Sequence, residues 1–238
     1  MRHKGLFLLG LIAALCALLL FMPLRFALNM VLPSSSTLTA RAASGTIWSG
    51  QIAGIKMGQI SLGDMQAGLA ILPLFTAHAE YHFEPMANGT AQPLQGRVGT
   101  GFGGRYVADL NGQLPLEGVD ARLPLSHLEL TGFSAAFDGG VCRRASGSVR
   151  MLLKPGSLDA LGLNNGFLGQ AKCDKNALLL PLVSQSSNER AEIRLQASGD
   201  YVVTVTIQNE NPEVGLALTA AGFAPIAQGY RMSVKGQL

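Results

Sequence analysis

The chain has 238 residues, enough for one large domain or two small ones with a substantial core. Hydrophobic residues make up 48% and charged residues 14%, whereas about 25% charged residues is usual for a soluble domain. This composition excludes intrinsic disorder and a long coiled coil. The net charge is +3, and Arg2 and Lys4 supply two of those charges. Nucleic acid is therefore not expected as a partner, because its binding requires clustered basic residues.

An uncharged apolar segment covers residues 5–24. As a helix it would cover about 30 Å, the thickness of the hydrocarbon core of a bilayer. Arg2, His3 and Lys4 precede it and only Arg25 follows closely, which favours a cytoplasmic N-terminus. A cleaved signal peptide is the alternative, but residues 21–25 (FMPLR) make a poor cleavage site. We expect a cytoplasmic tail at 1–4, a retained single-pass anchor at 5–24 and a linker at 25–43.

Short alternating runs of apolar and polar residues follow the linker, and they define a β domain over residues 44–238. The clearest are residues 190–197 and 201–207, joined by Ser-Gly-Asp, a pattern that predicts an antiparallel hairpin. Similar runs occur at 46–52, 55–62, 65–72, 77–83, 105–113, 128–137, 145–153 and 230–235. The one helix that we expect beyond the anchor is at 157–163. Frequent glycine indicates bends and bulges in the sheet. The expected fold is all-β, with a curled antiparallel sheet after one membrane helix.

Two cysteines, Cys142 and Cys173, lie in the part of the chain expected outside the cytoplasm. A cysteine pair in an oxidising compartment is most simply a disulfide. A metal site is the weaker interpretation, because the two lack a CxxC spacing or a nearby histidine.

The sequence contains no convincing catalytic or cofactor motif. Residues 99–104 (GTGFGG) spell G-x-G-x-x-G, but a strand-like run follows where a nucleotide site needs a helix. This favours a glycine-rich hairpin. His78, Glu80, His82 and Glu84 alternate along one face of a predicted strand and could bind a metal. Their spacing of about 7 Å is too wide for chelation by near neighbours, so a solvated strand face is the better interpretation. We expect no catalytic residues, no metal and no cofactor.

Several short motifs, taken in order, resemble the type II secretion system protein N family. They are the end of the apolar segment at 23–28, SGTIWSGQI at 44–52, GVCRRASG at 140–147, Leu-Gly at 161–162 before Cys173, Gly-Tyr at 229–230 and GQL at 236–238. The element around Cys142 departs slightly from the family pattern. Together they extend over essentially the whole chain.

The resemblance implies a bacterial inner-membrane protein whose periplasmic part is similar to AsmA-like domains, with sheets that curl into a groove or half-pipe. It implies a structural or assembly role in the export of folded proteins from the periplasm across the outer membrane. The implied partners are other type II secretion components, such as inner-membrane protein C and the secretin, and the lipid bilayer. Trp48 is either a core anchor or a partner contact. An alternative function is lipid handling, with phospholipid held in an apolar groove.

Overall fold

The chain folds into one large antiparallel sheet of sixteen strands, as seen in a computed structural model that describes residues 10, 17, 20–26, 38–58, 60–86, 94–116, 125–154, 166–209 and 211–237. Its strands are β1 (Leu38–Thr39), β2 (Ala42–Gly45), β3 (Gly50–Met57), β4 (Ile60–Leu69), β5 (Ala79–Pro85), β6 (Gln95–Gly101), β7 (Gly104–Pro115), β8 (Leu125–Asp138), β9 (Val141–Leu153), β10 (Phe167–Gln170), β11 (Lys172–Asp174), β12 (Ala177–Ser184), β13 (Glu189–Leu195), β14 (Asp200–Ile207), β15 (Ala224–Ile226) and β16 (Gly229–Gln237). Two helices, α3 (Ile71–Leu74) and α4 (Pro212–Ala220), interrupt the strands. The prediction of an all-β antiparallel fold is confirmed.

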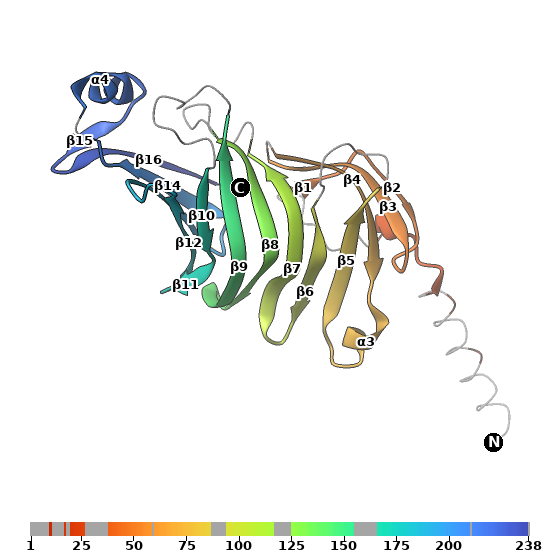
Figure 1. Cartoon of the computed structure of the whole chain (residues 1–238). Coiled ribbons are helices and arrows are strands. Elements are labelled where there is room, and N and C mark those ends of the chain that lie inside the picture. Colours follow the sequence, from red (N-terminus) through yellow and green to blue (C-terminus); the bar gives the residue numbers. More distant parts are fainter. Residues whose placement is uncertain are drawn as a thin grey trace.

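The strands follow each other in space almost as they do along the chain. From β3 to β10 each strand pairs with the next, and the order then continues through β12, β13, β14 and β16 to β15. Figure 1 shows this succession, coloured from orange to blue, in a sheet that is bent rather than flat. Within the described residues the order begins at β1 and ends at β15, so the sheet is open.

Bulges account for part of the bending. The pairing of β3 with β4 shifts between Ile52 and Ile55, and that of β8 with β9 shifts between Thr131 and Ser134. Each shift contains a glycine with positive φ, Gly54 at +63° and Gly132 at +58°. Such an extra residue bends its strand and increases the local twist. The sequence-based expectation that glycines mark bends is met at these two positions.

The two ends of the sheet differ. Consecutive antiparallel strands place alternate turns at the same end, so the turns β2–β3, β4–β5, β6–β7, β8–β9 and β13–β14 share one end. Helix α3 lies in the β4–β5 connection, and we call this end the α3 end. Helix α4 connects β14 to β16 at the opposite end, which we call the α4 end.

The buried apolar side chains form one cluster that extends from β3 to β16, with most of its members in β8–β16. The predicted hairpin is confirmed as β13 and β14, with Leu195 opposite Tyr201. Its alternation places Ala191 beside Val205, and β16 adds Met232 to the same row. All three side chains are buried. Alternating residues therefore line the core as their spacing predicts.

Other local predictions are corrected. Residues 46–49 form the turn between β2 and β3 instead of beginning a strand. The expected helix at 157–163 lies outside the described residues, whereas α4 is a helix that sequence reasoning missed. Its signal is Pro212, a residue favoured at the first helical position. Strand β12 was also missed, because its continuous apolar run (ALLLPLVS) has no alternation and its residues are buried on both faces.

The expected anchor, residues 5–24, lies mostly outside the described residues. Within the part of the chain that is described, no helix combines the length and the apolar character needed to cross a bilayer.

Candidate interaction sites

The end of the N-terminal apolar segment is docked onto the first hairpin of the sheet. Pro23 forms an isolated antiparallel bridge with Thr46, and the backbone N–H of Ile47 donates to the carbonyl of Met22 at 3.1 Å. The side chain of Leu24 is only 1% exposed. It occupies space that Gly50 leaves free, since a Cβ there would lie 2.5 Å from Leu24 Cδ2. Residues 22–24 thus have a defined place on the sheet.

Trp48 is in the β2–β3 turn, between the docked segment and β4. Its side chain is half-buried. Its carbonyl lies so close to β4 that a Cβ on Gly68 would approach it to 2.5 Å. The alternatives of core anchor and partner contact for Trp48 both stay predictions.

Three of the four polar residues of the predicted strand, Glu80, His82 and Glu84, lie on β5, and His78 directly precedes it. Glu80 accepts a hydrogen bond from Tyr106 at 2.7 Å and pairs with Arg97 at 3.4 Å. His78 is held by Thr76 through its Nδ1. His82 and Glu84 are exposed. In the described part of the chain, no three histidine, cysteine, aspartate or glutamate side chains are grouped so as to hold a metal ion.

On the face of the sheet that carries Glu80 and His82, aromatic rings lie over glycines of the neighbouring strand. Tyr106 reaches Glu80 across Gly99, where a Cβ would lie 2.3 Å from Tyr106 Cζ. His82 covers Gly68 in the same way. Burial, and then the hydrogen bond to Glu80, raise the pKa of Tyr106 above its ordinary value of 10.0. Glu80 is therefore part of a structural network.

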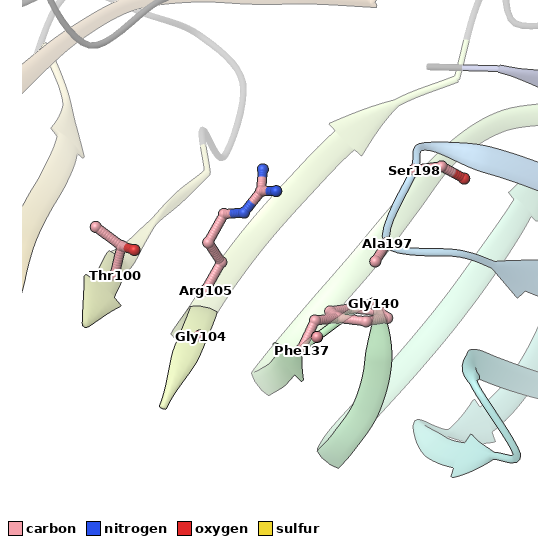
Figure 2. Close-up of a pocket in the computed structure, with 8 residues that line it drawn as sticks. Thr100, Gly104, Arg105, Phe137, Gly140, Ala197 and Ser198 are labelled. Carbon is pink, nitrogen blue, oxygen red and sulfur yellow. The ribbon is translucent and has the colours of Figure 1, made fainter. Parts of the chain in front are cut away.

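An open hollow of about 410 Å³ lies at the α3 end of the sheet, between strands that are distant in the order. Figure 2 shows Arg105 between Thr100 and Phe137, with Ala197 and Ser198 on the β13–β14 turn. In a flat sheet β6 and β13 would be about 29 Å apart, six strand spacings. Because Thr100 of β6 and the turn that follows β13 line one hollow, the sheet must curl. The sequence predicted a curled sheet but not a role for Arg105, because no local pattern shows which strands the curl brings together.

The sulfurs of Cys142 and Cys173 are joined in a disulfide, the pairing expected from the sequence. The bond connects the start of β9 to β11, and the backbone N–H of Cys142 also donates to the carbonyl of Asn176 at 3.1 Å. The link closes a loop of 31 residues in sequence separation. The disulfide therefore joins β9 to β11, and both of these strands also contact β12.

The fold defines the class of the protein as a single open antiparallel sheet in which strands follow each other in nearly sequential order. Residues 36–233 match the family "Type II secretion system (T2SS), protein N". The chain belongs to this family of type II secretion components.

A curated relative, the type II secretion system protein N of Vibrio cholerae serotype O1, is 29% identical over 127 residues. The match covers 50% of this chain and 50% of the relative, so the chain spans about half of that protein's length. No solved structure matches the chain.

Proposed function

We propose that this chain is a single-pass inner-membrane subunit with a structural or assembly role in type II secretion. Residues 5–24 serve as the anchor, the N-terminus lies in the cytoplasm and the sheet lies in the periplasm. The uncharged segment with basic residues before it supports this topology. The Cys142–Cys173 disulfide also supports it, because such bonds persist in the periplasm. The chain contributes to the export of folded proteins across the outer membrane.

The open edge of β16 is the observation that carries the structural role. One side of β16 pairs with β14 along residues 230–237, whereas β15 covers the other side only at residues 229–231. Among the described residues, no strand pairs with the outer side of residues 232–237. An edge of this kind has unpaired N–H and C=O groups that can accept an added strand. The proposed partners, inner-membrane protein C and the secretin, dock there.

Site-specific photocrosslinking tests this docking mode. A photoreactive amino acid replaces Lys235, an exposed residue on the open part of the edge. A matched variant replaces Arg231, which is also exposed and basic but is opposite Ala224 of β15. Because cross-strand neighbours lie about 5 Å apart, an added strand brings the partner within reach of position 235. We expect a crosslink to inner-membrane protein C or the secretin from position 235 and a much weaker one from 231.

Equal crosslinking from both positions would show that β16 is not the docking edge. The structural role itself fails if neither partner co-purifies from detergent and a deletion strain secretes normally. A soluble mature protein that begins near residue 44 would overturn the anchor.

The hollow at Arg105 favours a second candidate function, the handling of phospholipid. The curl of the sheet places an arginine side chain at the margin of the hollow, where a lipid phosphate could pair with it. Native mass spectrometry of the gently purified protein tests this function. Stoichiometric phospholipid that is lost in Arg105→Gln supports it, and protein free of lipid in several detergents contradicts it.

A further inference from the structure

The α3 end of the sheet has an unusual concentration of exposed apolar side chains. Helix α3 and the residue after it expose Ile71, Leu72, Leu74 and Phe75, with Leu72 81% and Phe75 83% exposed. No residue of α3 is buried. Exposing several large apolar side chains to water in one place is unfavourable, and such patches usually mark a site that another surface covers.

Phe102 extends this surface from the next hairpin. It is 89% exposed at the tip of the β6–β7 turn. The start of β5 pairs with the end of β6 through Ala79 and Thr100, so the turn lies next to the end of α3. The ring of His78 also lies over Gly101, where a Cβ would come within 2.3 Å. We call Ile71, Leu72, Leu74, Phe75 and Phe102 the α3 patch, and Figure 1 shows its two elements at the same end of the sheet.

Backbone hydrogen bonds place the α3 patch close to the end of the N-terminal apolar segment. Ile47 donates to the carbonyl of Met22 at 3.1 Å and accepts from the N–H of Leu69 at 2.9 Å. Each hydrogen bond crosses one spacing between neighbouring segments, so Met22 and Leu69 are about 10 Å apart, twice the strand spacing. Helix α3 begins two residues after Leu69, at Ile71. The patch therefore starts within a few residues of the point where the apolar segment meets the sheet.

The charge of this region suits a membrane surface. Residues 70–79 and 101–104 contain no charged side chain. At the end of the apolar segment, Phe21 and Phe26 are exposed and the guanidinium of Arg25 lies 5.6 Å from the ring centre of Phe26. Aromatic and basic residues of this kind are typical of the boundary between lipid and water.

We propose that the α3 patch inserts into the interfacial layer of the phospholipid bilayer and fixes the sheet against the membrane surface. The proposal rests on the proposed function, because it takes residues 5–24 as the anchor. With residues 22–24 docked on the sheet, a membrane that holds the anchor lies next to the patch. Apolar side chains on such elements lie about 5–10 Å deep, at the boundary of headgroups and acyl chains.

Depth-dependent fluorescence quenching on the full chain tests the proposal. An environment-sensitive fluorophore is attached at Leu72→Cys, Phe75→Cys or Phe102→Cys in a Cys16→Ala background, where Cys142 and Cys173 are joined to each other. The protein is reconstituted into vesicles of phosphatidylethanolamine and phosphatidylglycerol. We expect a blue shift, quenching by nitroxide-labelled lipid and protection from aqueous iodide at all three positions.

The control is the same fluorophore at Leu216→Cys. Leu216 is an apolar residue of α4 that is 76% exposed at the opposite end of the sheet. It should have the emission of a probe in water and be quenched by iodide. A further pair of variants carries glutamate: Leu72→Glu with Phe75→Glu should abolish lipid quenching of a probe at position 102, whereas Leu216→Glu should not.

The outcomes separate this proposal from the anchor. Flotation with vesicles after an alkaline wash reports on residues 5–24. If the protein floats but positions 72, 75 and 102 behave like 216, the patch proposal is overturned and the anchor stands. If the protein fails to float, the anchor proposal fails. In that case, lipid quenching of a probe at position 72 after vesicles are added still supports the patch proposal, and the absence of quenching refutes it. Protection from iodide without lipid quenching indicates a protein occupant and also refutes it.

Discussion

Leu24 and Gly50 fit one another: the side chain of Leu24 fills the space in which a Cβ on Gly50 would lie, 2.5 Å from Leu24 Cδ2. Leu24 comes from the end of the apolar segment, and Gly50 begins β3. Through this contact the end of the N-terminal segment is packed against the sheet at a fixed place. Removing the contact between Leu24 and Gly50 should lower the stability of the first hairpin.

Leu24→Ala should lower the free energy of unfolding by about 2–5 kcal/mol, because it leaves a cavity at a buried site. Urea unfolding of the detergent-solubilised protein, followed by fluorescence of the single tryptophan Trp48, provides the measurement. Leu20→Ala is the control, since Leu20 is exposed in the same segment. Equal effects of the two variants would contradict the docking of Leu24.

Gly50→Ala should destabilise the same contact from the other side, by about 1–3 kcal/mol, because overpacking forces neighbours to move. The new Cβ would also lie 2.9 Å from the carbonyl oxygens of Ser44 and Thr46, which are backbone atoms and cannot rotate away. Gly103→Ala, where no atom lies within 4 Å, is the matched control. In the same urea experiment, an unchanged midpoint for Gly50→Ala would refute the close packing.

Removal of the disulfide through Cys142→Ala with Cys173→Ala should lower the free energy of unfolding by roughly 3–4 kcal/mol. The reason is the entropy that the unfolded chain regains when a loop of 31 residues is opened. Comparison of unfolding curves with and without reductant provides the measurement. The reductant should destabilise the unaltered protein and leave the double variant unchanged; a shift in the double variant would point to another origin.

Ionisation of Tyr106 should weaken the fold at alkaline pH. Its pKa is raised in the folded protein, by burial and then by the hydrogen bond to Glu80, so the unfolded chain loses the phenolic proton first. The contribution of Tyr106 to stability is therefore complete below its ordinary pKa of 10.0 and is lost as the pH rises through the raised pKa of the folded state. Near-ultraviolet absorbance, compared between the unaltered protein and Tyr106→Phe, measures this titration.

Glu80→Gln should bring the pKa of Tyr106 down towards its ordinary value, because a charged acceptor that favours the protonated phenol is removed. Glu84→Gln is the control on the same strand, as Glu84 is exposed. If the two variants titrate alike, Glu80 is not the partner that holds the proton of Tyr106.

Local patterns in the sequence were sufficient for the fold class and for several hairpins. The alternation in residues 190–207 predicted β13 and β14, and the glycines at 99–104 predicted the β6–β7 turn, because both depend only on neighbours along the chain. The family also followed from short ordered motifs, of which the matched region 36–233 contains most. A continuous apolar run such as β12 has no such period, so its strand could not be predicted.

Contacts between residues far apart in the chain could be seen only in the folded sheet. Glu80 is paired with Arg97 and Tyr106, 17 and 26 residues away, and Leu24 packs on Gly50. These contacts depend on strand register, for which a single sequence has no signal. The glycines predicted a curled sheet, but not which strands the curl brings together. The residue pattern alone predicted alternating strands after an apolar segment, because the period of side chains along a strand is a local property. Only the folded sheet could place the α3 patch beside residue 22, because that neighbourhood is created by hydrogen bonds between segments far apart in the chain.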